Sequence, residues 1–105
     1  MKTCNDLLSV LSGHIGKERG ISVKVLAEQL DCPQRAVRYL VTELRDDGVA
    51  VCGHPGAGYF IAANAEELEE TCQFLRSRAM HSLHLEAQLR KMPLADLVGQ
   101  MHLRT

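Results

Sequence analysis

The residues with the clearest chemical potential are the polar side chains that follow Pro33 in the stretch "PQRAVRYLVTEL". An arginine guanidinium can bind guanine at two points, and a glutamine amide can do the same for adenine. Five polar side chains recur at helical spacing on the side opposite the apolar residues: Gln34, Arg35, Arg38, Tyr39 and Thr42. They predict a surface for contacting base edges. The alternative is a merely solvated face, as charged helix faces usually are.

Basic residues before this stretch are candidates for holding phosphates. Lys17, Arg19 and Lys24 precede or open the preceding helix, and the tip "GHPGAG" adds His54 as its one cationic candidate. Between residues 17 and 47, however, there are six basic and six acidic residues, and the whole chain has a net charge of −1. Binding to a polyanion would therefore depend on how the charges are segregated and not on a basic excess.

Three amphipathic segments are needed to position these side chains. A first helix is expected from Asn5 or Asp6, followed by a loose connection at Gly13, Gly16 and Gly20. A second helix follows the N-cap Ser22, and a third runs from about Pro33 to Asp47, with Gly48 as its stop. Their apolar faces comprise Leu7, Leu8, Leu11 and Ile15, then Val25, Leu26 and Leu30, then Val37, Leu40, Val41 and Leu44.

A hairpin is predicted next, because two short apolar runs flank a tip rich in glycine. The expected strands are Val49–Cys52 and Tyr59–Ala62, and the tip is Gly53–Gly58. A lone hairpin is barely stable in water, so it must pack against the helices. Gly56 and Gly58 are expected to adopt positive backbone angles or to approach another surface closely, unless they serve only the turn.

A long helix capped by Asn64 is predicted over "AEELEETCQFLRSRAMHSLHLEAQLRKM", followed after Pro93 by a short helix from Leu94 to Met101. Its glutamates gather at the start and its last turn is basic, which matches the helix dipole. One apolar stripe predicts a homodimer interface, formed by Leu68, Cys72, Leu75, Ala79 and Leu83. The alternative is that this stripe folds back on the first helix as core.

The stretch from Leu26 to Ala62 resembles the winged helix-turn-helix of bacterial transcription regulators. With its flanking residues, the resemblance covers roughly residues 20 to 63. The tip and second strand, "GHPGAGYFIA", are similar to the wing of regulators of the IscR type. The resemblance implies a third helix that reads the major groove and a wing beside it. The positions that carry it are Leu26-Ala27, Leu30, Val37, Leu40, Leu44 and Gly48-Val49.

Two departures from that pattern bear on cofactors and on the turn. Regulators of the IscR type that carry an iron–sulfur cluster have three closely spaced cysteines after the wing, and here only Cys72 follows it. We therefore expect no cluster. Asp31 stands at the usual turn glycine, and Cys32 occupies the apolar turn position.

Other classes of site have little support. Cys4, Cys32, Cys52 and Cys72 lie 28, 20 and 20 residues apart, which indicates reduced thiols in the cytoplasm. His81 and His84 share a helix face, but two ligands do not make a zinc site. No run of residues is long and apolar enough to cross a membrane, and the N-terminus lacks the features of a signal peptide. No nucleophile–base arrangement is present, so no enzyme activity is expected. No metal and no cofactor are expected either.

The sequence thus predicts a mostly α-helical protein with a small β-hairpin. Residues 1–63 are expected to form a winged helix-turn-helix domain, and residues 64–105 a helical segment for dimerisation or interaction. The expected function is sequence-specific binding of double-stranded DNA as a homodimer, as a transcriptional repressor in a bacterium or a phage. The alternative is a winged-helix module that binds a protein partner, with little or no DNA binding.

Overall fold

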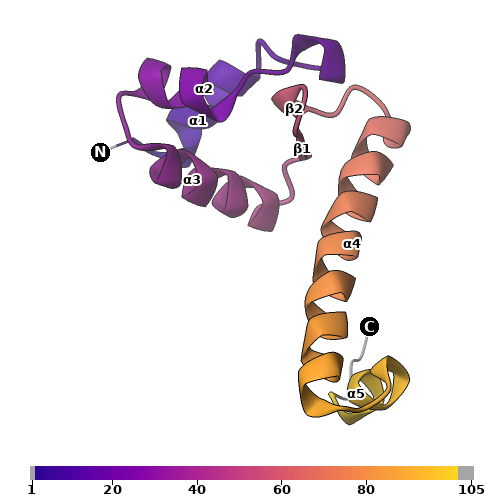
Figure 1. Ribbon diagram of the computed structural model, residues 1–105. Helices are drawn as coiled ribbons and strands as arrows, with labels where there is room; N and C mark the ends of the chain where they lie inside the picture. Colours follow the sequence, from indigo (N-terminus) through magenta and orange to yellow (C-terminus); the bar gives the residue numbers. More distant parts are fainter. Residues whose placement is uncertain (1, 102–105) are drawn as a thin grey trace. The chain divides into compact units, whose positions relative to one another are not determined.

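The computed structural model describes residues 2–101, which are mostly helical and include one two-stranded antiparallel hairpin (Figure 1). This confirms the predicted mixture of helices with a small hairpin. The elements in chain order are α1 Cys4–Leu11, the 3-10 helix η1 Lys17–Arg19, α2 Val23–Leu30, α3 Gln34–Asp46, β1 Val51–His54, β2 Gly58–Ile61, α4 Ala65–Arg90 and α5 Leu94–Gln100.

The chain divides into two compact units, one ending at Thr71 and one beginning at Cys72. The first unit therefore includes the opening turns of α4, beyond the residue 63 at which the sequence placed a boundary. The last four residues of the predicted C-terminal segment, 102–105, lie outside the described residues.

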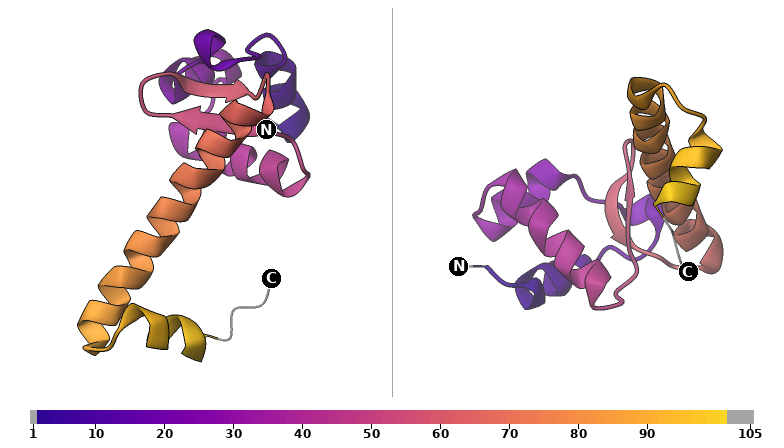
Figure 2. Two further views of the ribbon diagram at one scale, coloured as in Figure 1. Left: turned by 90° about the vertical axis from the view of Figure 1, so that its right-hand side faces the viewer. Right: turned by 90° about the horizontal axis from the view of Figure 1, so that it is seen from below.

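The core of the first unit is formed by the apolar stripes of α1, α2 and α3, with the hairpin against them (Figure 2). All four stripe residues predicted for α3 are buried, so its periodicity was interpreted correctly. The buried cluster comprises Leu7, Leu11, Ile21, Leu26, Ala27, Leu30, Val37, Leu40, Val41, Leu44 and Val51.

Side-chain caps fix where the first two helices begin. The N–H of Thr3 donates to the Asp6 carboxylate at 2.8 Å, so α1 begins slightly earlier than the sequence predicted. This hydrogen bond also holds the pKa of Asp6 below its ordinary value. Ser22 caps α2 as predicted, its hydroxyl accepting the N–H of Val25 at 3.2 Å.

The turn between α2 and α3 spans only Asp31, Cys32 and Pro33. Asp31 takes the left-handed conformation, with φ of 51°, which aspartate tolerates better than most residues. Pro33 is the N-cap of α3 and not its first residue, since its ψ of 153° is extended. The turn ties back to α2 through the N–H of Cys32, which donates to the carbonyl of Ala27 at 3.1 Å.

The end of α3 explains why β1 starts two residues later than predicted. Gly48 has φ of 86°, and the N–H of Val49 donates to the carbonyl of Leu44 at 2.9 Å. This is the hydrogen-bond pattern of a Schellman cap, so Val49 completes the helix end and is not part of the strand.

The hairpin pairs Cys52 with Phe60 and His54 with Gly58, which leaves Pro55–Ala57 as the turn. The predicted tip was therefore too long, because Gly53 and Gly58 belong to the strands. Gly58 adopts the expected positive φ, at 82°, whereas Gly56 does not. A side chain at Gly58 would also collide with the carbonyl of Ile21.

The segment between α1 and α2 is not loose, contrary to what its glycines suggested. Ile21 exchanges two backbone hydrogen bonds with Tyr59, both of 2.8 Å. The N–H of Gly16 donates to the carbonyl of Ile61 at 2.8 Å. This segment therefore pairs along the outer edge of β2, and Gly20 has no room for a side chain because the carbonyl of Ala57 lies against it.

The face of the hairpin that points away from the core of α1, α2 and α3 is buried as well. Cys52 is fully buried, and Phe60, its partner in the register, is 2% exposed. The Cys52 thiol lies 3.7 Å from the carbonyl of Glu67, so the opening turns of α4 cover this face.

In the second unit, Lys91 ends α4 with φ of 56°, and Pro93 caps α5. The long helix is therefore two residues shorter than predicted. Ala87 and Leu97 are buried in this unit. No helix in the described part of the chain has the length and hydrophobicity needed to cross a membrane.

The thiol of Cys4 is an unusual group of the first unit, and it supports a prediction about reactivity. It donates to the Glu43 carboxylate at 2.8 Å, and this contact raises the pKa of Cys4 to about 11. Because the thiolate is the reactive form, we expect Glu43→Gln to lower that pKa and to raise the alkylation rate of Cys4 about tenfold at pH 9. Peptide mass spectrometry after timed alkylation measures the rate, and the exposed Cys72 is the internal reference. An unchanged rate would contradict this account.

Candidate nucleic-acid interface

The outward face of α3 carries the residues that the sequence predicted for reading DNA. Gln34, Arg35 and Arg38 are exposed, and so is Thr42. Tyr39 has 66% of its surface exposed, which is high for an aromatic residue. One helix therefore presents all five together, turned away from its buried stripe.

The side chains of the two arginines on this face are uncommitted, which means that they have no partner in the described part of the chain. Within residues 2–101, the side chains of Arg35 and Arg38 form no ion pair and no hydrogen bond; only the backbone carbonyl of Arg38 accepts from the Thr42 hydroxyl, at 3.1 Å. Arg45 differs, although it lies on the same side of the helix. Its Nε donates to the carbonyl of Val51 at 2.9 Å, so Arg45 joins α3 to β1.

The two ends of α3 differ in charge. Its first turns carry Arg35 and Arg38 and no acidic residue, whereas its last turn carries Arg45 together with Glu43 and Asp46. A helix that enters the major groove does so with its N-terminal residues, where the helix dipole is also positive. The polarity of α3 therefore favours an anion at its N-terminal end.

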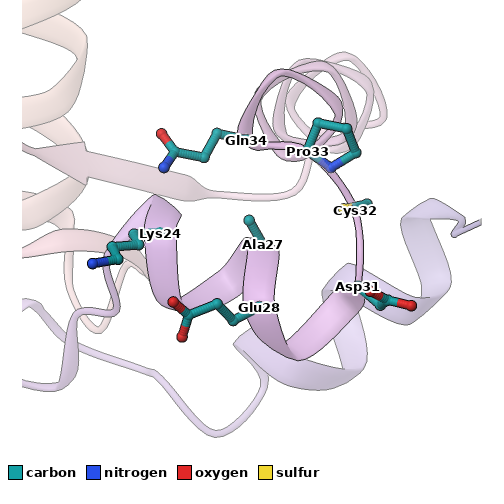
Figure 3. A pocket seen from close by; sticks show the side chains of 7 residues that line it. All are labelled: Lys24, Ala27, Glu28, Asp31, Cys32, Pro33 and Gln34. Atoms are coloured by element: carbon teal, nitrogen blue, oxygen red, sulfur yellow. The ribbon is translucent and has the colours of Figure 1, made fainter.

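An open hollow lies beside that end of α3 (Figure 3). Lys24 and Gln34 extend to the same side of it, which places an ammonium and an amide where a phosphate oxygen could accept from both. Glu28 and Asp31 also line the hollow, so its charged side chains are one ammonium and two carboxylates. The lining residues are Lys24, Ala27, Glu28, Asp31, Cys32, Pro33 and Gln34.

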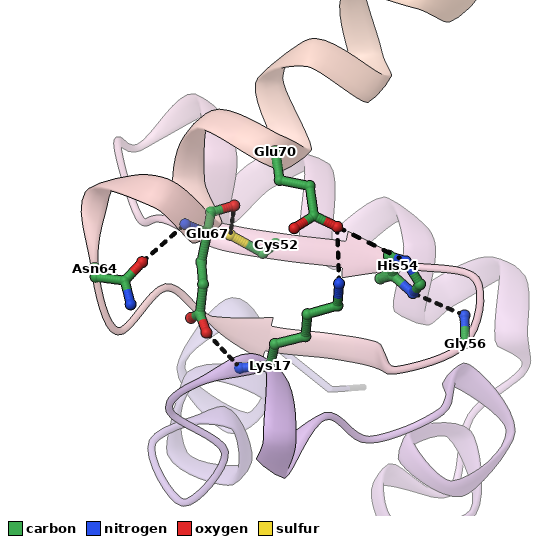
Figure 4. A network of polar contacts seen from close by, with 7 residues as sticks. All are labelled: Lys17, Cys52, His54, Gly56, Asn64, Glu67 and Glu70. Carbon is green, nitrogen blue, oxygen red and sulfur yellow. Dashed lines mark hydrogen bonds and ion pairs between the residues drawn. The ribbon is translucent and has the colours of Figure 1, made fainter.

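His54, the candidate at the tip, does not project freely from the hairpin (Figure 4). Its Nδ1 accepts the N–H of Gly56 at 3.0 Å, so the ring proton of the neutral form lies on Nε2. That Nε2 faces the Glu70 carboxylate, 3.7 Å from Oε1. The same carboxylate oxygen accepts from Lys17 Nζ at 2.8 Å.

Glu67 fixes the start of α4 to the same region. Its carboxylate accepts the N–H of Ala63 at 2.9 Å and that of Lys17 at 3.0 Å. These N–H groups hold the pKa of Glu67 below its ordinary value, and the Lys17 ammonium does the same for Glu70. Asn64 caps α4 as predicted, accepting the N–H of Glu67 at 2.9 Å.

Sequence reasoning did not find the contacts that Glu67 and Glu70 make with Lys17. The spacing of Asn64 and Glu67 is a recognisable helix start, but nothing in it indicates that Glu67 would reach the N–H of Lys17. The glutamates were interpreted only as partners of the helix dipole.

The predicted dimer stripe on α4 is largely uncovered. Leu68 and Leu75 are 42% and 41% exposed, and Cys72 and Ala79 are exposed as well. Leu83 is half-buried, so this position is less available than the sequence suggested. Further exposed apolar side chains on α4 are Phe74, Met80, Leu85 and Leu89.

Among residues 2–101 no three histidine, cysteine or acidic side chains lie close enough together to hold a metal ion. Comparison of the chain with models of known protein families, with curated proteins and with solved structures gives no match.

Proposed function

We propose that this protein is a sequence-specific DNA-binding transcriptional regulator with a winged helix-turn-helix domain. The observation that carries the proposal is the outward face of α3, where Arg35 and Arg38 are exposed and uncommitted at the positive end of the helix. An arginine pair without internal partners binds a ligand anion or base edge without first breaking an ion pair.

The arrangement around α3 supports this proposal. The short turn Asp31–Pro33 joins α2 to α3, and β1 and β2 follow directly as a wing. The pairing of Ile21 with Tyr59 adds a third, strand-like segment to the hairpin. In this frame α3 lies in the major groove, with Gln34, Arg35 and Arg38 toward base edges. Lys24 holds an adjacent phosphate.

A homodimer formed through α4 is part of the proposal. The exposed side chains of Leu68, Cys72, Leu75 and Ala79 offer one apolar stripe to a second copy. A two-fold dimer would bring two recognition helices to successive half-sites, and occupation of such an operator would repress transcription.

A second candidate is a module that binds a protein partner. One observation favours it: His54 is the wing's only cationic candidate, and its ring is engaged by Gly56 and Glu70. In that case α4 would dock an apolar surface of another protein, and duplex DNA would not bind.

Binding of a random-sequence duplex across a salt series separates the two candidates. For a regulator, affinity falls steeply as salt rises from about 50 to 200 mM, because each phosphate contact releases counterions. Light scattering in the same buffers is expected to give the mass of a dimer. Absence of binding even at the lowest salt would contradict the regulator and leave the protein-binding module.

A further inference from the structure

The ion-pair cluster beside the tip of the hairpin has the geometry of an occupied anion site. Lys17 Nζ and His54 Nε2 converge on a single oxygen, Oε1 of Glu70, at 2.8 and 3.7 Å (Figure 4). They come from η1 and from β1, segments far apart in the sequence, and Glu70 reaches them from α4. Lys17 Nζ is within hydrogen-bond distance of this oxygen, and His54 Nε2 is within ion-pair range of it when the ring is protonated. The oxygen is therefore placed as an oxygen of a bound phosphate would be.

This cluster is accessible to an external anion. The side chains of Lys17 and His54 are 36% and 39% exposed, and that of Glu70 is 53% exposed. An ion pair with this much exposure contributes little to stability, so its exchange for another anion has a small cost. Glu67, the neighbouring carboxylate, is committed to two backbone N–H groups and does not compete for the Lys17 ammonium.

The position of the cluster indicates which anion it serves. His54 is the residue directly before the turn Pro55–Ala57, and the tip contains no lysine or arginine. Lys17 therefore supplies the positive charge that the wing's own sequence lacks. In the proposed complex the hairpin lies next to α3, to which Arg45 joins it, so the anions within its reach are the phosphodiesters of the DNA backbone.

We propose that Lys17 and His54 form a second phosphate-binding site of the DNA interface, and that Glu70 occupies this site in the free protein. On binding, a backbone phosphate replaces the Glu70 carboxylate. The contact that holds the wing thus also lowers the affinity for DNA. This inference rests on the proposed function, because its ligand is duplex DNA.

The test compares Glu70→Gln with wild-type protein in the salt series on random-sequence duplex. Glutamine keeps the size of the side chain and removes the competing charge. We expect affinity at about 0.1 M salt to rise about three- to tenfold, and the slope of log affinity against log salt to steepen by about one. Glu66→Gln is the matched control, because it removes the same charge from an exposed position on the same helix. It is expected to change affinity less than about twofold and to leave the slope unchanged.

A double substitution tests whether Lys17 is the group that Glu70 occupies. In Lys17→Met with Glu70→Gln, the gain in affinity and the steeper slope should both disappear. Equal behaviour of Glu70→Gln and Glu66→Gln, or weaker binding by Glu70→Gln with an unchanged melting temperature, would overturn the inference while the proposed function stands. Binding by neither Glu70→Gln nor wild-type protein would overturn both proposals. Binding by Glu70→Gln alone would support the inference and show that Glu70 blocks the free protein.

Discussion

Replacing both Arg35 and Arg38 with alanine is expected to weaken binding of duplex DNA roughly 100-fold or more, since each good arginine contact to a base contributes about 1–3 kcal/mol. Both side chains are exposed and uncommitted, and alanine is a strong helix former, so α3 should remain folded. Fluorescence anisotropy with a labelled duplex measures the loss.

The salt dependence of the double variant distinguishes the two kinds of contact. If the arginines bind phosphates, the slope becomes shallower by about two; if they bind base edges, the slope is unchanged and discrimination between sequences is lost. Arg76→Ala with Arg78→Ala removes the same net charge from exposed positions on α4. A loss of similar size in that control would show that α3 has no special role.

Phe60→Ala is expected to have the largest effect on stability. Phe60 is 2% exposed and is the largest fully buried side chain in the described part of the chain. Truncation of a buried phenylalanine costs about 3–5 kcal/mol, a large share of the 5–15 kcal/mol that a typical domain has. We expect the variant to unfold at a much lower denaturant concentration than wild-type protein. The near-ultraviolet circular dichroism of the two tyrosines measures this unfolding.

Phe74→Ala provides the matched control, because it removes the same side chain from a position that is 45% exposed on α4. Its effect should stay within about 1 kcal/mol. If both variants lose the same stability, the hairpin is not part of the cooperative core of the first unit.

Much of the fold followed from local patterns. The stripe of α3, the caps at Ser22 and Asn64, and the stop at Gly48 were all predicted, because each depends on residues within a few positions of one another. The stripe of α2 was predicted only in part, because Val25 is 39% exposed and Ala27 is buried with Leu26 and Leu30. The start of β1 was not predicted correctly, because the helix cap that uses Val49 is a backbone arrangement that many sequences can adopt.

The contacts that the sequence concealed are long-range ones. Glu67 and Glu70 on α4 bind Lys17 on η1, and Ile21 pairs with Tyr59. In the sequence, a glutamate at a helix start has the same pattern of neighbours whether or not its side chain contacts a lysine far along the chain. The exposed face of α3 was predictable for the opposite reason, since it depends only on the period of one helix.

The pairing of Ile21 with Tyr59 has a consequence for how the chain folds. The outer edge of β2 is satisfied by a segment that precedes both α2 and α3, so the two helices lie inside the loop that this pairing closes. Contacts between α2 and α3 are more local and cost less chain entropy, so they are expected to form first. During synthesis, Ile15 and Ile21 must then wait for β2 to leave the ribosome. A chain interrupted after Asp47 would expose an unpaired backbone edge and become prone to aggregation.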